Sequence, residues 1–207
     1  MKIYLTRHGQ TKANLENRFQ GFSDAPLTED GIKAAKDLRD FLKNKDIDMI
    51  ACSSLPRAKN TALIIKANRN WPIYYYDELK EFNFGDLEGL IIPELAGSEI
   101  YENFFEHPQI FQAPKGENFK EFILRISNKI EDLYQEFFDK KILVVAHGLV
   151  VRTLILHYRN TPLEKLHQGK YPFSCSLSEL DYQGKDKVTI ISECTIDHLK
   201  NKTLVGN

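Results

Sequence analysis

Apolar residues recur along the chain with two different spacings, which predict alternating strands and helices. Short apolar runs rich in β-branched and aromatic residues predict buried strands at 3–5, 47–52, 73–76 and 142–146. Longer stretches with an apolar residue every three or four positions predict helices over 29–42, 56–67, 118–138 and 149–158. This order predicts a three-layer α/β domain, with a mostly parallel central sheet and helices on both faces.

Local signals sharpen several boundaries. Thr28 precedes two acidic residues and is a plausible N-cap, while Pro56 suits the first turn of the helix that follows it. Near the end of the chain, two further candidate strands at 176–182 and 188–191 are joined at Gly184 and predict a hairpin.

Three segments lack a clear period. Residues 12–24 have loop composition with many amide and hydroxyl groups, and residues 77–89 mix acidic and aromatic side chains. The stretch 91–115 holds Pro and Gly residues around a short candidate helix, which is typical of a binding loop or lid. Because no repeat or linker divides the chain, we expect a single domain over 1–207 with a lid-like excursion at about 90–116.

Composition narrows the range of functions. The 42% hydrophobic and 28% charged content is ordinary for a globular protein, and a net charge of -1 gives no reason to expect nucleic-acid or membrane binding. No apolar run has the length of a signal peptide or a membrane span, so a cytoplasmic protein is expected. The three cysteines are far apart and predict buried thiols rather than a zinc or redox site.

Ionisable side chains follow each predicted parallel strand, and in such sheets ligands bind beyond the carboxyl ends of the strands. They are Arg7 and His8 after the first strand, Arg57 after the second, Glu78 or Glu81 after the third and His147 after the fourth.

This set of side chains suits phosphoryl transfer. A neutral imidazole such as that of His8 is a nucleophile, and a guanidinium such as that of Arg7 holds phosphate through paired hydrogen bonds. A carboxyl crowded by aromatic rings and an anionic substrate has a raised pKa and can act as a general acid. Periodicity does not choose this acid among Glu78, Glu81, Asp86 and Glu88. Metal binding by the two histidines and a carboxylate is less favoured, since the spacing of common zinc sites is missing and arginines would repel a cation.

At these positions the chain resembles the histidine phosphatase superfamily, a phosphoglycerate-mutase-like family named for its Arg-His-Gly signature. The matching motifs, in chain order, are Arg7-His8-Gly9-Gln10-Thr11, Asn14, Gln20-Gly21 with Asp24, Pro26-Leu27-Thr28, Gly31, Ser53-Ser54-Leu55-Pro56-Arg57-Ala58, Glu81 with Phe84-Gly85, Glu88-Gly89, Gly116-Glu117 and Val145-Ala146-His147-Gly148.

The resemblance implies one role for each central residue. His8 would become the phosphohistidine and Glu81 would protonate the leaving oxygen. Arg7, Arg57 and a protonated His147 would hold the phosphoryl oxygens, with no metal and no cofactor. Further phosphate or substrate contacts are expected from the following loop and aromatic positions: Asn14, Gln20, Gly21, Ser23, Phe82 and Phe84.

Departures from the family pattern favour its phosphatase branch. The related cofactor-dependent mutases carry an arginine directly after the catalytic glutamate and a tyrosine two residues further on, where this chain has Phe82 and Phe84. Residues 91–115 contain no arginine, and Tyr101, Phe104 and Phe105 suggest an ester with apolar bulk.

The resemblance therefore implies a metal-independent phosphomonoester hydrolase of the histidine acid type, either broad in specificity or similar to α-ribazole phosphatases. A cofactor-dependent phosphoglycerate mutase and a non-catalytic phospholigand-binding protein are the alternatives. The expected partner is a small-molecule phosphomonoester, with no nucleic acid and no membrane, and a homodimer is a possible assembly.

Overall fold

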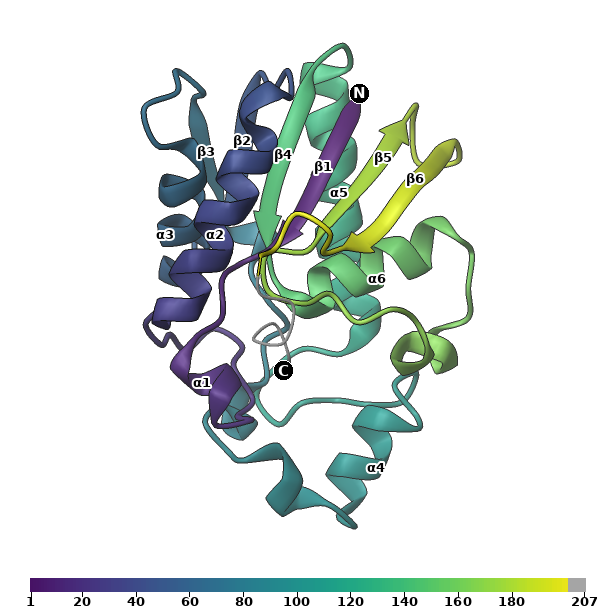
Figure 1. Cartoon of the computed structure of the whole chain (residues 1–207). Helices are drawn as coiled ribbons and strands as arrows, with labels where there is room; N and C mark the ends of the chain where they lie inside the picture. The colour runs from purple at the N-terminus through teal and green to yellow at the C-terminus, as the bar shows by residue number, and fades with distance from the viewer. Residues whose placement is uncertain (201–207) are drawn as a thin grey trace.

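A six-stranded sheet with the strand order β3-β2-β4-β1-β5-β6 lies at the centre of the computed structural model, which describes residues 1–200 (Figure 1). The predicted domain over 1–207 therefore extends into residues 201–207, which lie outside the described part. The strands are β1 (Lys2–Arg7), β2 (Met49–Ser53), β3 (Ile73–Tyr76), β4 (Lys141–Ala146), β5 (Leu177–Tyr182) and β6 (Val188–Thr195).

Helices cover both faces of the sheet, so the predicted three-layer α/β fold is confirmed. One face packs against α2 (Glu29–Phe41) and α3 (Pro56–Lys66), and the other against α5 (Phe119–Phe137) and α6 (Gly148–Tyr158). Alternate residues of one strand pack against the two helical layers, because successive side chains of a strand point to opposite faces. Tyr4 packs with the α2 and α3 side, whereas Ile3 and Leu5 pack with the α5 and α6 side.

The four strands β3, β2, β4 and β1 are parallel, and β5 and β6 join the edge as the predicted antiparallel hairpin. The register places Arg7 of β1 opposite Ala146 of β4, and Cys52 of β2 opposite Val145 of β4. The residues that follow these strands are therefore next to one another at one edge of the sheet. The candidate catalytic residues were predicted from the sequence to lie at this same edge.

The helix boundaries follow the expected caps. Thr28 Oγ1 accepts a hydrogen bond from the Gly31 N–H at 3.0 Å, and Pro56 occupies the first turn of α3. Asn118 and Glu121 form a capping box at the start of α5. Such caps satisfy N–H groups that have no partner inside the helix.

Three elements differ from the sequence-based expectation. β1 reaches Arg7, and β6 continues to Thr195, four residues beyond the predicted end at 191. The segment 12–24, predicted to be a loop, contains the four-residue helix α1 (Lys12–Leu15). A capping box between Thr11 and Asn14 holds this single turn, which is too short to give an apolar period.

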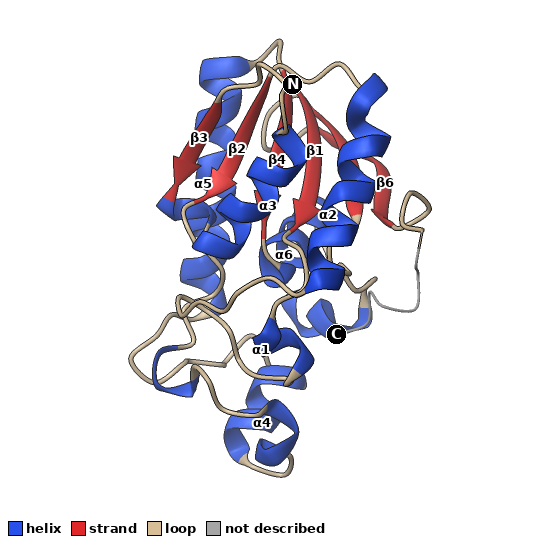
Figure 2. Cartoon of the chain, turned by 60° about the vertical axis from the view of Figure 1, so that its left-hand side comes forward, coloured by secondary structure: helices blue, strands red, loops and turns tan. Residues whose placement is uncertain are grey.

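The excursion after β3 carries the short helix α4 (Glu99–Phe105), with Ser98 as its N-cap. Figures 1 and 2 both place α1 and α4 beyond the carboxyl ends of the parallel strands, away from the body of the sheet. The three cysteines are free and buried, as expected. Within residues 1–200, no helix combines the length and the apolar character needed to cross a membrane.

Candidate active site

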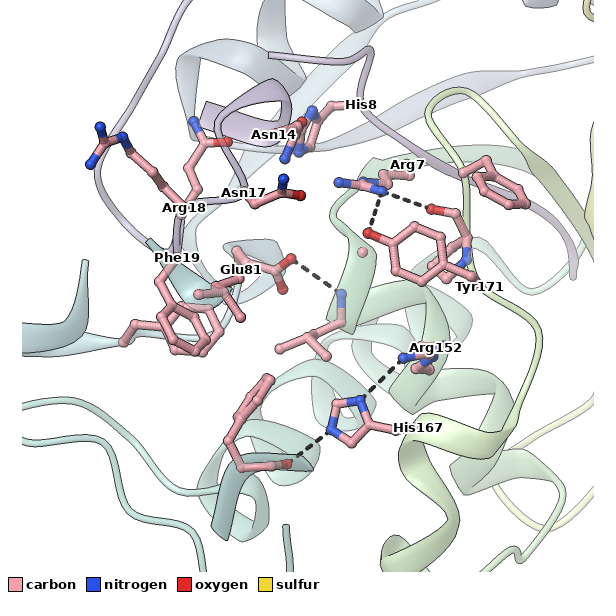
Figure 3. Close-up of a pocket in the computed structure, with 18 of the residues that line it drawn as sticks. Arg7, His8, Asn14, Asn17, Arg18, Phe19, Glu81, Arg152, His167 and Tyr171 are labelled. Atoms are coloured by element: carbon pink, nitrogen blue, oxygen red, sulfur yellow. Dashed lines mark hydrogen bonds between the residues drawn. The ribbon is translucent and has the colours of Figure 1, made fainter. Parts of the chain in front are cut away.

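A cavity of about 380 Å³ opens at the carboxyl edge of the sheet (Figure 3). Its inner end is formed by residues that follow strands β1 and β3, including Arg7, His8 and Glu81. Its outer wall includes residues of the excursion and of α6. The strand ends thus fix one end of the cavity and later segments of the chain form the other.

His8 is buried at the inner end of the cavity, and one of its ring nitrogens is hydrogen-bonded to the backbone. Its Nδ1 lies 2.7 Å from the carbonyl oxygen of Gly9, and because a carbonyl can only accept, Nδ1 carries the proton. The lone pair is then on Nε2, which accepts a hydrogen bond from Arg57 Nε at 3.2 Å. Burial, together with Arg57 and Arg7, lowers the His8 pKa well below its ordinary value. His8 is therefore a neutral imidazole with its lone pair at Nε2.

Arg57 comes from the first turn of α3 and is almost fully buried behind His8. Its Nη1 donates to the Ser23 carbonyl and its Nη2 to the Gly21 carbonyl, each at 2.8 Å. Asp24 lies 3.5 Å away and supplies the negative charge. These contacts hold the guanidinium in one orientation against the imidazole.

Arg7 is also buried, but fewer of its guanidinium N–H groups have hydrogen-bond partners than those of Arg57. Its Nη1 donates to the hydroxyl of Tyr171 at 3.0 Å and to the carbonyl of Pro172 at 3.1 Å (Figure 3). Its Nε is buried and has no hydrogen-bond partner among the described residues. A guanidinium with an unused donor beside a nucleophile is well placed to bind an anionic oxygen.

Glu81 lies on the other side of the cavity. Its Oε1 accepts from the Phe82 N–H at 3.0 Å and its Oε2 from the Leu149 N–H at 3.1 Å. Burial raises the pKa of the Glu81 carboxyl above its ordinary value, although both amides act in the opposite direction. The carboxyl thus keeps its proton to a higher pH than an exposed glutamate, as a general acid requires.

His147 follows β4 and is fully buried, with its ring centroid 5.2 Å from that of His8. Burial and the neighbouring Arg57 lower its pKa well below the ordinary value, and the expectation that it is protonated when it holds a phosphoryl group stays a prediction. Its Nε2 lies 2.7 Å from the Ser53 hydroxyl, whereas its Nδ1 is buried without a partner in the part of the chain that the structure describes.

The loop after β1 contributes amide groups to the same cavity. Asn14 lines it, although its Oδ1 already accepts from the Thr11 N–H at 3.0 Å. Gln20 also lines it, and its Nε2 is a further buried donor without a partner among residues 1–200. Buried donors of this kind are rare in folded proteins unless a ligand or water uses them.

Five of the expected phosphate or substrate contacts are absent from the cavity lining. Two of them, Arg57 and His147, lie beside His8, which Arg57 contacts through Nε and His147 through its ring. Gly21 and Ser23 do not line the cavity, and their carbonyls hold Arg57 instead. A Cβ at Gly21 would lie 2.4 Å from the Phe82 carbonyl oxygen, so only glycine fits there. Phe82 is completely buried among core phenylalanines, and the expected substrate contact at this position is wrong. Phe84 lines the cavity as expected.

The cavity also contains residues that the sequence did not single out. Phe104 and Phe105 come from the excursion as anticipated, but Tyr101 does not line the wall. The unanticipated lining residues include Asn17, Arg18, Phe19, Arg152, His167 and Tyr171. One signal was available for Arg152, since it is the single charged residue in the stretch 149–156, where every other residue except Thr153 is apolar. No group of three or more His, Cys, Asp or Glu side chains suited to a metal ion occurs within residues 1–200.

Comparison with known proteins agrees with this geometry. Residues 3–192 match the model of the histidine phosphatase superfamily, branch 1. The chain belongs to this superfamily. It is 32% identical over 177 residues to the adenosylcobalamin/alpha-ribazole phosphatase of Escherichia coli (strain K12), covering 84% of this chain and 87% of the relative.

Two further relatives cover a similar share of this histidine phosphatase. The probable phosphoglycerate mutase GpmB of Yersinia pestis (strain Pestoides F) is 31% identical over 185 residues, which are 88% of this chain and 86% of the relative. The solved structure of Bacillus stearothermophilus YhfR matches with a TM-score of 0.91 at 31% identity, covering 96% of this chain and 99% of that one. The family predicted from the sequence motifs is confirmed, and the chain is a phosphatase of this superfamily.

Proposed function

We propose that this phosphatase hydrolyses small phosphomonoesters through a phosphohistidine at His8, without a metal ion. The observation that carries the proposal is the state of His8: a buried, neutral imidazole whose Nδ1–H is tied to the Gly9 carbonyl, which leaves the lone pair of Nε2 at the phosphate end of the cavity. The buried, unpartnered donors of Arg7 and Gln20, which both line the cavity, support an anion at the same end.

In the first step, Nε2 of His8 attacks phosphorus in line with the leaving oxygen. The N–P bond forms as the P–O bond to the leaving group breaks, and protonated Glu81 gives its proton to that oxygen. As the N–P bond takes up the lone pair of Nε2, the Arg57 Nε–H that contacts this nitrogen can donate to a phosphoryl oxygen instead.

In the second step, water attacks the phosphohistidine. The Glu81 carboxylate takes a proton from this water, the P–N bond breaks, and inorganic phosphate leaves. His8 recovers its lone pair and Glu81 its proton, so the cycle closes.

The guanidinium groups of Arg7 and Arg57 would neutralise the negative charge of the transferred phosphoryl group. Arg7 offers the unused Nε donor, and Arg57 is already fixed by the Gly21 and Ser23 carbonyls. Donors that need no reorganisation during the reaction stabilise developing charge most effectively. In its Nδ1–H tautomer, His147 would add a further donor, since its Nδ1 is buried without a partner among the described residues.

The direct test uses p-nitrophenyl phosphate in buffer with EDTA. The wild-type protein is expected to hydrolyse it, and His8→Ala to lose at least about 10³-fold in kcat, because no other group forms the intermediate. His107→Ala, at an exposed histidine, is the matched control and should retain full activity. Hydrolysis that survives His8→Ala, or that disappears with EDTA, would overturn the mechanism.

The substrate and the acceptor are tested separately. α-Ribazole phosphate belongs in a screen of phosphometabolites, since a relative's name refers to α-ribazole. The relative described as a probable phosphoglycerate mutase makes transfer to a second hydroxyl the alternative activity. Strong stimulation of 3-phosphoglycerate isomerisation by 2,3-bisphosphoglycerate, with negligible phosphate release, would favour the mutase.

A further inference from the structure

Arg152 lines the outer part of the cavity and has no role in the proposed reaction. It lies in α6, one helical turn beyond the His147-Gly148 junction, and its side chain is half-buried. Figure 3 shows it next to His167 at the end of the cavity away from His8. A buried or half-buried charge usually has a partner of opposite sign, so its surroundings are informative.

No carboxylate compensates Arg152. It takes part in no ion pair among the described residues, and its Nε is buried without a hydrogen-bond partner there. Its hydrogen bonds are long contacts with neutral acceptors, from Nη1 to His167 Nδ1 at 3.3 Å and from Nη2 to the Gly169 carbonyl at 3.4 Å. No side chain among residues 1–200 therefore balances the charge of this guanidinium.

His167 does not supply the missing negative charge, and its tautomer explains the contact. Its Nε2 lies 3.0 Å from the Phe104 carbonyl, which can only accept, so Nε2 carries the proton and Nδ1 the lone pair. Nδ1 then accepts from Arg152. The imidazole orients the guanidinium as a neutral acceptor, and it joins the excursion helix α4 to α6.

Arg152 shares its environment with Arg7, the proposed phosphate ligand. Both line the cavity, both lack an ion pair within residues 1–200, and both have a buried Nε without a partner there. Each guanidinium carbon lies 5.3 Å from the centre of the Tyr171 ring. Twice this distance, about 10.6 Å, is the largest separation that the two guanidinium carbons can have.

Between these two arginines the wall is largely apolar. Phe84, Phe104 and Leu149 line the cavity together with these two arginines, and the third arginine of the lining, Arg18, is ion-paired with Glu16 at 2.5 Å. Glu81 is the only carboxylate in the lining, and it is assigned to the proton transfer. The expectation of a purely apolar leaving group therefore leaves one cavity-facing cation unexplained.

We infer that Arg152, oriented by His167, is a second anion-binding subsite, and that the preferred substrates are phosphomonoesters carrying a further carboxylate or phosphate group that reaches Arg152 while the reacting phosphoryl group is at Arg7. This inference rests on the proposed function. The reacting phosphoryl group binds at Arg7 and His8, and the second anion binds at Arg152. The carbon skeleton between them lies against the aromatic wall.

A different role for Arg152 would be purely structural, since it also contacts the segment at His167 and Gly169. The two roles differ in what a substitution changes. Loss of a subsite changes the preference between esters that differ only in the second anion. Loss of a structural contact changes the turnover of all esters by the same factor.

The experiment compares kcat/KM for two matched pairs of esters. The first pair is 3-phosphoglycerate and glycerol 3-phosphate, which differ by a carboxylate. The second is fructose 1,6-bisphosphate and fructose 6-phosphate, which differ by a phosphate. The wild-type protein should prefer the more anionic member of at least one pair, and the pair concerned identifies the second group as carboxylate or phosphate.

Arg152→Gln should reduce that preference by about 10- to 100-fold, mainly through KM, because one charge-assisted contact is lost. Arg152→Lys should restore part of it. Arg159→Gln, at the end of the same helix and ion-paired with Glu193 at 2.7 Å, is the matched control and should leave the preference unchanged. Absence of any preference in the wild type, or an equal loss on both members of each pair, would overturn the inference.

A binding measurement separates this inference from the catalytic proposal. Calorimetric titration of the same four esters into His8→Ala, with and without Arg152→Gln, requires no turnover. If the wild-type protein proves inactive, the proposed function fails, but a preference that depends on Arg152 would still support the subsite. Equal affinity of the two His8→Ala proteins for every ester would count against it.

Discussion

Arg57, next to the nucleophile, and Arg152, at the outer end of the cavity, are held in opposite ways. Arg57 is fixed by two carbonyls at 2.8 Å and by Asp24, and it in turn contacts the nucleophilic nitrogen of His8. Arg152 contacts a neutral imidazole, a carbonyl at 3.4 Å and the face of the Tyr171 ring. Asp24 therefore balances the charge of Arg57, whereas neither Arg152 nor Arg7 has an ion pair among residues 1–200.

This difference separates the chemistry from the choice of substrate. The inner groups follow parallel strands whose register is set by the sheet, so their positions cannot change independently. The outer groups come from α6, from the excursion and from the segment before β5, which are joined by single side-chain contacts such as that of His167. Substitutions at the outer end can alter the leaving group while the reaction stays the same.

The largest expected effect comes from breaking the inner end. Arg57→Ala removes a phosphoryl ligand and leaves the Gly21 and Ser23 carbonyls without their donor. We expect kcat/KM to fall by on the order of 10³-fold and the free energy of unfolding to fall by about 3 kcal/mol. Activity assays and urea denaturation measure the two losses.

Arg152→Gln provides the contrast in the same denaturation experiment, with an expected loss in the free energy of unfolding of about 1 kcal/mol or less. If both variants unfold at the same urea concentration, the proposed contrast between a balanced and an unbalanced cation is wrong.

A somewhat smaller effect is expected from removing the general acid. Glu81→Gln should lower kcat/KM by about 10²- to 10³-fold for alkyl esters such as glycerol 3-phosphate, whose leaving oxygen needs a proton. The loss should be smaller for p-nitrophenyl phosphate, since its leaving group departs as a stable anion.

The pH profile of the same enzyme checks this assignment. Because the Glu81 pKa is raised, its protonated form persists above the usual glutamate range, and kcat/KM for alkyl esters should fall as the pH rises through that pKa. Glu81→Gln should lose this alkaline limb. An unchanged limb in the variant would assign the proton to another group.

The smallest effect concerns the contact that joins α4 to the outer end. Burial and Arg152 lower the pKa of His167 to about 4, against an ordinary value of 6.5. As the pH falls from about 6.5 to about 4, the unfolded chain binds the proton first, so the stabilising contribution of neutral His167 is present above this range and is lost within it.

His167→Gln should therefore flatten the decline in the free energy of unfolding over this range by about 1 kcal/mol, measured by urea denaturation at several pH values. His107→Gln, at an exposed position, is the control and should follow the wild-type curve. Identical slopes for wild type and His167→Gln would show that His167 does not titrate as described.

The inner end could be predicted from the sequence because its residues immediately follow apolar runs. A strand ending at Ala146 followed by His147 fixes a position in space, since the carboxyl ends of parallel strands share an edge. Helix caps such as Thr28 were equally local signals and are confirmed. The family motifs then chose Glu81 from four neighbouring acids, a choice that periodicity could not make.

The outer end could not be predicted in the same way. Phe82 and Phe84 lie in a segment of short 3₁₀ turns without a strand or helix period, so no pattern showed that one ring enters the core and the other the cavity. The position of Arg152 in the cavity wall could not be predicted either, because it involves packing against Tyr171, a long-range contact that no local sequence pattern shows. The missed residues are those placed by tertiary packing.

The position of β1 in the sheet also bears on how the protein is synthesised. Its two neighbours are β4 and β5, so β1 pairs with segments that begin at residues 141 and 177. A ribosome adding 5–20 residues per second would leave β1 without either neighbour for roughly ten seconds. During this interval Arg7 and His8 cannot form the site, so we expect a nascent chain to gain phosphatase activity only after the residues of β4 and β5 have left the ribosome.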